Sequence, residues 1–247
     1  MSNDWPMALF LLLVSPAVGS FLGVLVDRLP CGLGALTAPS RCATCRARLG
    51  WRDLVPILSS VATRGRCRDC GAAIPGHLMR IELAAMLAAV LAVALTGATA
   101  EMWLIAALLW CLIALFYSDL LHYRLPDALT LVLLMLGLLR AWVDPARGLH
   151  DSILSAAAAL AAFWLIRWGY YRWRGREGLG LGDVKLMAGV GAAVGWSQVP
   201  VVTLLAAGMA LAVVALDAVL GKSRPSADTR LPFGSFLAAA TAVILMI

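Results

Sequence analysis

Asp119 and Asp183 are the two residues of this 247-residue chain whose type and position point most directly to chemistry. Each lies beside a long apolar run, where acidic side chains are energetically costly and usually functional. Two carboxylates that meet can share one proton, because repulsion between like charges keeps both from ionising together. The ionised carboxylate can then take a proton from water while its protonated partner polarises a carbonyl group. The two residues are therefore candidates for an aspartyl dyad that hydrolyses a peptide bond.

The residues before Asp183 support this interpretation. Gly178, Gly180 and Gly182 precede it at alternate positions, and glycine lets another chain approach the backbone closely. An extended substrate could therefore lie against Gly180 and Gly182. The alternative is that the glycines form a flexible loop and that Asp183 only caps a helix. The presence of Asp119, a second aspartate at the end of an apolar run, favours the interpretation as a dyad.

The expected helix ends also predict which carboxylate holds the shared proton. Asp183 begins an apolar helix, where the helix dipole stabilises an anion, and Asp119 ends another, where the dipole disfavours one. We therefore expect Asp183 to be the base and Asp119 the protonated acid, within a pair that titrates as a unit.

Four cysteines predict a metal site. Cys42, Cys45, Cys67 and Cys70 form two CxxC pairs separated by 21 residues in a polar segment. Pairs at this spacing can close a tetrahedral zinc site of four thiolates, which leaves no position for a catalytic water. We expect a structural Zn2+ that stabilises a segment too small to have its own core. A redox-active dithiol pair is the alternative, but the surrounding sequence has no thioredoxin-like pattern.

The elements that position these residues are predicted to lie in a membrane. Hydrophobic residues make up 62% of the chain and charged residues only 14%, which is unusual for a soluble domain. The sequence predicts an all-α polytopic membrane protein of about eight transmembrane helices, with a small cytoplasmic zinc-binding loop domain. The expected spans are Met7–Val26, Ile81–Leu95, Met102–Tyr117, Leu125–Val143, Ile153–Trp168, Val184–Val194, Val199–Leu220 and Phe233–Ile247.

Positive charge predicts the orientation of these spans. Basic loops stay in the cytoplasm, so residues 27–80, 118–124, 168–183 and 221–230 are expected on that side. This arrangement leaves only Arg140 and Arg147 of the 20 Lys and Arg residues on the opposite side. It also places Asp119 and Asp183 at the same cytoplasmic face, although only positive charge was used to derive it.

These features divide the chain and exclude several functions. We expect a first transmembrane helix (1–26), a cytoplasmic four-cysteine loop domain (27–80) and a transmembrane peptidase domain (81–247). Membrane orientation accounts for the net charge of +6, and no basic helix predicts binding of nucleic acid. The sequence has neither an HExxH motif nor a GxSxG motif, which disfavours a zinc protease and a serine hydrolase.

The combined motifs resemble the GxGD-type prepilin peptidases of type IV pili and type II secretion, over nearly the whole chain. The motifs that carry the resemblance are Gly19-Ser20-Phe21-Leu22, Arg28-Leu29-Pro30, Pro39-Ser40-Arg41-Cys42, Leu49–Pro56, Gly65–Gly71, Leu125-Pro126-Asp127, Gly180–Leu186, Gly191–Trp196 and Leu231-Pro232-Phe233-Gly234.

The resemblance implies a membrane aspartic endopeptidase of the bacterial inner membrane. Members of the family cut the basic leader of prepilins or pseudopilins after a glycine, at the cytoplasmic face. Asp119 and Asp183 match the catalytic pair of the family. Lys185 matches the lysine that follows the GxGD motif, and we expect it to support the substrate site together with Gly180 and Gly182.

A second activity is also implied. Many members of the family methylate the new N-terminal residue with S-adenosyl-L-methionine, and Glu82 is the candidate residue for methyl transfer. Gly23, Leu78 and Met79 depart from the usual residues of the N-terminal part, so a peptidase without methylation is the first alternative. The second is a non-catalytic transporter or assembly scaffold, although its ion site would be expected near the bilayer midplane. The expected partners are prepilin or pseudopilin substrates and membrane lipids.

Overall fold

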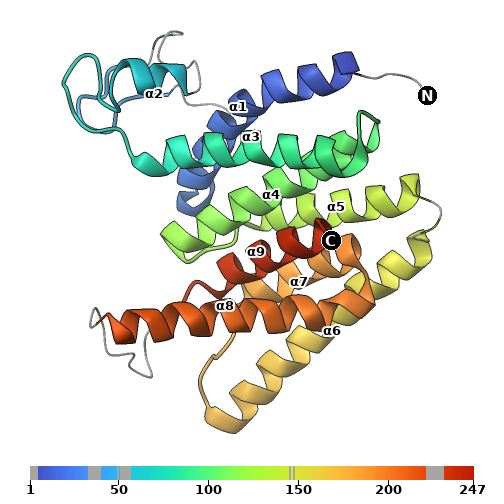
Figure 1. Cartoon of the computed structure of the whole chain (residues 1–247). Coiled ribbons are helices and arrows are strands. Elements are labelled where there is room, and N and C mark those ends of the chain that lie inside the picture. Colours follow the sequence, from blue (N-terminus) through green and yellow to red (C-terminus); the bar gives the residue numbers. More distant parts are fainter. Residues whose placement is uncertain are drawn as a thin grey trace. The chain divides into compact units, whose positions relative to one another are not determined.

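The computed structural model describes residues 5–32, 40–48, 50, 57–144, 146, 148–220 and 231–247. The predicted cytoplasmic loop 221–230 and parts of the cysteine loop, residues 33–39, 49 and 51–56, therefore lie outside the described residues. All the regular elements of the described residues are helices (Figure 1). They are α1 (Trp5–Arg28), η1 (Leu29–Cys31), α2 (Leu58–Ala62), α3 (Gly76–Thr96), α4 (Glu101–His122), α5 (Asp127–Val143), α6 (Leu149–Arg174), α7 (Leu181–Val194), η3 (Trp196–Gln198), α8 (Val199–Val219) and α9 (Phe233–Leu245).

The all-α fold is confirmed, and a helix lies at each of the eight predicted spans. The predicted number of about eight transmembrane helices is nevertheless too high. Within the part of the chain that the structure describes, five helices are long and apolar enough to cross a membrane: α1, α3, α4, α6 and α8, the first and last extended by the adjoining 3-10 turns. α5, α7 and α9 have 17, 14 and 13 residues. At about 1.5 Å per residue, each is shorter than the roughly 30 Å of hydrocarbon that a span must cross.

The chain divides into two compact units, Met1–Ala114 and Leu115–Ile247, with the boundary inside α4. In the first unit α1 packs against α3 over most of its length. A Cβ atom on Gly19 of α1 would lie 2.6 Å from the Cα atom of Glu82, so glycine is what permits this close packing. Trp110 of α4 donates a hydrogen bond from Nε1 to the carbonyl of Ala85 on α3, at 2.9 Å.

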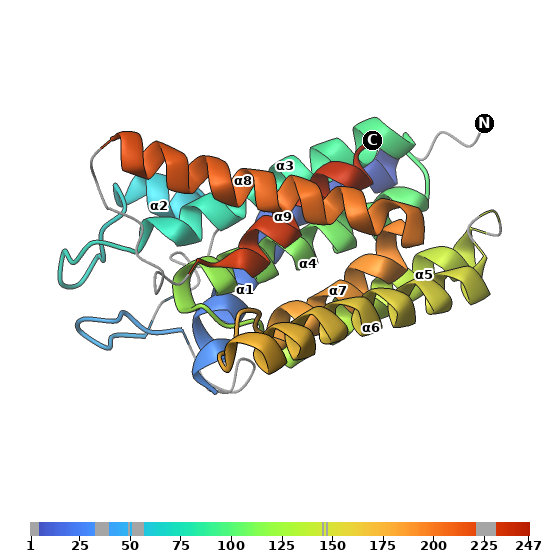
Figure 2. The same cartoon turned by 90° about the horizontal axis from the view of Figure 1, so that it is seen from below.

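The core of the second unit is α7, in which ten of the 14 residues are buried. α5 and α6 lie along it (Figure 2), and α9 also packs against it. Glycines make these contacts close: a Cβ atom on Gly191 would lie 2.5 Å from the carbonyl oxygen of Ser155 on α6. Ser152 of α6 donates a hydrogen bond to the carbonyl of Ala192, at 2.8 Å. The short α7 is thus enclosed largely by protein, unlike α8, where Leu204, Leu211 and Val219 are exposed for contact with lipid.

This packing predicts that Gly191→Ala destabilises the protein. The added methyl group would meet the backbone of α6, and overpacking of a core typically costs about 1–3 kcal/mol. We expect a lower melting temperature for the detergent-purified variant. The matched control is Gly208→Ala in α8, where a Cβ atom meets nothing within 4 Å. An equal melting temperature for Gly191→Ala and the wild type would contradict the packing.

Candidate active site and metal site

Asp119 lies near the end of α4, where its side chain is only 6% exposed. Its Oδ2 atom accepts a hydrogen bond from the backbone N–H of Ser235, at 2.7 Å, and lies 3.2 Å from the hydroxyl of the same residue. Ser235 is in the first turn of α9, and its N–H group also donates to the carbonyl of Pro232, at the longer distance of 3.2 Å. Asp119 therefore ends one helix and faces the N-terminus of another.

Asp183 lies in the first turn of α7 and is 9% exposed. Its Oδ2 atom accepts a hydrogen bond from the backbone N–H of Gly180, at 3.3 Å, so this oxygen caps the helix. The other oxygen, Oδ1, points toward α9, where a Cβ atom on Gly234 would lie 3.0 Å from it. The capping interpretation and the dyad interpretation are thus compatible, because they concern different oxygen atoms.

Gly234 lies beside both carboxylates. A Cβ atom on it would be 3.0 Å from Asp183 Oδ1 and 3.1 Å from Asp119 Oδ2. The two oxygen atoms can be no farther apart than the sum of these distances, about 6 Å, so one water molecule or one carbonyl group can reach both. The structure therefore brings together the two residues that the sequence singled out.

The hydrogen bonds favour a distribution of the proton opposite to the one expected from the ends of α4 and α7. Donors to a carboxylate stabilise its ionised form, and the bond from Ser235 to Asp119 is the shorter. Asp119 also benefits from the dipole at the start of α9. The contact between Asp119 and Ser235 joins residues 116 positions apart, which no local pattern could have indicated.

The glycines of the GxGD motif serve close approach. Gly180 has φ −68° and ψ 146°, an extended conformation open to any residue. A Cβ atom on Gly182 would lie 3.0 Å from the Cβ atom of Leu125, and one on Gly180 would lie 3.2 Å from Asp183 Oδ2.

Lys185, also predicted to support the site, places its ammonium group 2.7 and 2.8 Å from the two carboxylate oxygens of Asp127. This ion pair joins α7 to the start of α5.

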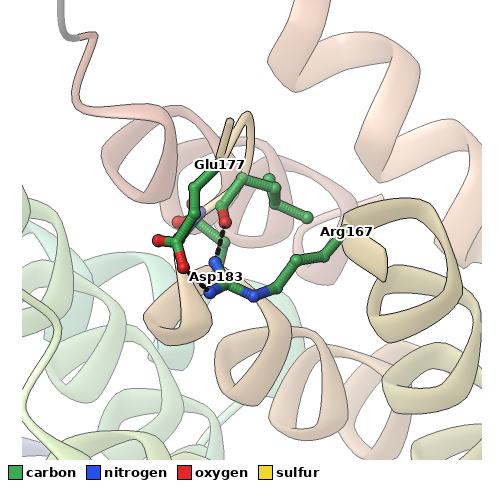
Figure 3. Close-up of polar contacts among 5 residues, drawn as sticks. Arg167, Glu177 and Asp183 are labelled. Atoms are coloured by element: carbon green, nitrogen blue, oxygen red, sulfur yellow. Dashed lines mark hydrogen bonds and ion pairs between the residues drawn. The ribbon is translucent and has the colours of Figure 1, made fainter. Parts of the chain in front are cut away.

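Arg167 is a residue of the site that the sequence analysis missed. Figure 3 shows its guanidinium group, which comes from α6, between the Glu177 carboxylate and the loop that precedes Asp183. It donates to the carbonyl of Leu179 and, at 2.5 Å, to Glu177. The arginine thereby fixes the backbone directly before the GxGD motif. In the sequence, Arg167 served only as one of the basic residues that orient the membrane spans, and nothing in its spacing set it apart from the neighbouring arginines.

The four cysteines come together as predicted. Their sulfur atoms all lie within 4.8 Å of one another and could hold a metal ion. The separations Cys42–Cys70 and Cys45–Cys67 are 3.8 and 4.0 Å. A tetrahedral Zn2+ with Zn–S bonds of about 2.3 Å separates its sulfur ligands by about 3.8 Å, so the donor set fits zinc.

The two CxxC pairs also have the same local fold. The N–H groups of Cys42 and Cys67 bond the carbonyls of Ala47 and Ala72, each five residues further along the chain. Hydrogen bonds from the backbone of Cys45 and then Thr44 lower the pKa of the Cys42 thiol to about 6, so this member of the cluster ionises most readily.

Glu82 lies on α3 and is 6% exposed. Its Oε2 atom accepts a hydrogen bond from the backbone N–H of Ile57, at 2.7 Å, in the segment between the two cysteine pairs. The carboxylate thus ties the cysteine loop to α3.

Known proteins resemble this chain over its whole length. Residues 105–216 match the model of the type IV leader peptidase family, and residues 13–96 match the bacterial peptidase A24 N-terminal domain. The chain is similar to the prepilin leader peptidase/N-methyltransferase of Aeromonas hydrophila, with 33% identity over 98% of this chain and 91% of the relative. The proteins of the same name from Burkholderia pseudomallei strain 1026b and Dickeya chrysanthemi are 36% and 35% identical. These alignments cover 96% and 100% of this chain and 84% and 95% of the relatives. No solved structure matches the chain significantly.

The cysteine cluster predicts that the purified protein contains about one zinc ion per chain, bound by four thiolates. Cys67→Ser or Cys70→Ser should lose most of this zinc and lower the melting temperature, as measured by elemental analysis and thermal unfolding. Cys31→Ser is the control, because Cys31 lies outside the cluster. Full zinc content in both cluster variants, or none in the wild type, would contradict the site.

Proposed function

The chain belongs to the type IV leader peptidase family, and from this premise we propose that it cuts the basic leader from type IV prepilins or pseudopilins. We place the reaction at the cytoplasmic face of the bacterial inner membrane, with Asp119 and Asp183 as the catalytic dyad. The observation that carries the proposal is the pair of buried carboxylates that both lie beside Gly234. The five long apolar helices support a location in the membrane.

The mechanism follows from a pair that holds one proton. The ionised carboxylate takes a proton from a water molecule, whose oxygen attacks the carbonyl carbon of the scissile bond. The protonated carboxylate donates its hydrogen bond to the carbonyl oxygen and stabilises the charge that develops there. The resulting tetrahedral species collapses as the C–N bond breaks and the leaving nitrogen takes a proton from the dyad. The pair is left with one proton, ready for another cycle.

We further propose that the chain methylates the new N-terminal residue with S-adenosyl-L-methionine. The relatives are named for both activities. Buried Glu82, tied to the cysteine loop through Ile57, is the candidate residue for this step. Cys42, Cys45, Cys67 and Cys70 would hold a structural Zn2+ and keep this loop folded.

The functional division into residues 1–26, 27–80 and 81–247 stays a prediction. It concerns activity, whereas the two compact units of the structure reflect packing and divide the chain inside α4.

Replacing either aspartate should abolish cleavage. Asp119→Asn and Asp183→Asn each remove a group that transfers a proton, so we expect cleavage of a model prepilin to fall at least about a hundredfold. The assay uses detergent-purified protein and reads product masses. With S-adenosyl-L-methionine present, the wild-type product should gain one methyl group.

Asp151→Asn is the matched control, because the Asp151 side chain is 80% exposed on α6, and it should cut at the wild-type rate. Wild-type cleavage by Asp119→Asn or Asp183→Asn would overturn the dyad. Cleavage without a gain of methyl mass would leave a peptidase alone.

Arg167 should affect the rate of cleavage, because it fixes the loop that precedes Asp183. Arg167→Ala removes the bonds to Leu179 and Glu177, and a misplaced catalytic group can cost about a hundredfold in rate. We expect kcat to fall by about tenfold or more and Arg167→Lys to recover part of it. Glu177→Ala should have a smaller effect, because its carboxylate is 66% exposed. Arg172→Ala, on the exposed end of α6, is the charge-matched control. Equal kcat values for Arg167→Ala and Arg172→Ala would contradict this role.

A further inference from the structure

We propose that Gly234 is a positioning residue of the dyad, because a residue without a side chain lets the first turn of α9 lie against both carboxylates without displacing them. This inference rests on the proposed function of Asp119 and Asp183. It makes the first turn of α9 a third element of the site, together with the end of α4 and the start of α7.

The conformation of Gly234 does not require glycine. It lies in the first turn of α9 and has no positive φ. Glycine in a helix is less favourable than alanine by up to about 1 kcal/mol, so another constraint must favour it here.

That constraint is space between reactive groups. A Cβ atom on Gly234 would lie 3.0 Å from Asp183 Oδ1, 3.1 Å from Asp119 Oδ2 and 2.7 Å from Leu125 Cδ1. A methyl group there would press on both carboxylates and displace them from the positions in which they can both reach one water molecule or carbonyl group, within about 2.6–3.2 Å. The missing side chain therefore lets α9 approach both carboxylates closely while they keep their positions.

The neighbouring residue, Ser235, holds the first turn of α9 in place. The Ser235 N–H group bonds Asp119 Oδ2 at 2.7 Å, and its hydroxyl donates to the carbonyl of Phe116 at 2.9 Å. Both contacts hold the first turn of α9 against the end of α4. A substrate would therefore meet carboxylates with set positions, as catalysis requires.

The test compares Gly234→Ala with Gly208→Ala, the glycine of α8 whose Cβ atom would meet nothing within 4 Å. We expect Gly234→Ala to lower kcat for a model prepilin about a hundredfold, because the reacting groups are displaced. KM should change far less, because the leader and the apolar part of the substrate still bind. Gly208→Ala should keep the wild-type kcat.

A second comparison separates lost function from poor packing. Leu125→Ala removes the nearest atom that the new methyl group would strike, so the double variant Leu125→Ala/Gly234→Ala should recover the melting temperature of Leu125→Ala. It should not recover cleavage, because the methyl group still presses on both carboxylates. Recovery of wild-type kcat in the double variant, or wild-type kcat in Gly234→Ala itself, would overturn the inference. Asp119→Asn and Asp183→Asn in the same assay test the dyad separately: if they are inactive while Gly234→Ala is active, this inference fails and the proposed function stands.

Discussion

The second unit is organised around two carboxylates that are held close together where little water reaches them. Asp119 and Asp183 are 6% and 9% exposed, and burying two negative charges side by side would be very costly. A shared proton removes one of these charges. The first turn of α9 compensates for the other, because its N–H groups and its dipole face Asp119. The position of α9 therefore depends on this hydrogen bond as well as on apolar packing.

Because the two carboxylates must be held close together, the helices of this unit also pack closely, and glycines occur where they meet. The start of α7, the start of α9 and the residue before α5 meet beside the carboxylates. Two of these segments contribute a glycine to the contact: Gly182 of α7 and Gly234 of α9 both face Leu125, which lies just before α5. Further along α7, Gly189 and Gly191 allow close contact with α5 and α6. Close packing limits how far the start of α7, and so Asp183, can shift.

Much of this arrangement could be predicted from the sequence, because the signals are local. Apolar runs gave the positions of eight helices, and the spacing of Cys42, Cys45, Cys67 and Cys70 indicated their cluster. The number of spans was too high because apolar composition alone does not distinguish a helix buried in protein from one that crosses lipid. The roles of Ser235 and Arg167 depend on contacts made only in the folded chain.

The expected distribution of the proton illustrates the difference between local and tertiary signals. From its own helix, Asp119 is at a C-terminus, where an anion is disfavoured. In the fold it also faces the N-terminus of α9, and the short bond from Ser235 acts over 2.7 Å directly on the carboxylate. The dipole at the start of α9 opposes the dipole at the end of α4, and the direct hydrogen bond from Ser235 adds to the effect of α9. The tertiary contact therefore outweighs the local one. Since the other donor, Gly180, bonds Asp183 at the longer distance of 3.3 Å, the shared proton is better placed on Asp183. The oxygen of Asp183 that does not cap α7, Oδ1, is the one that lies beside Gly234.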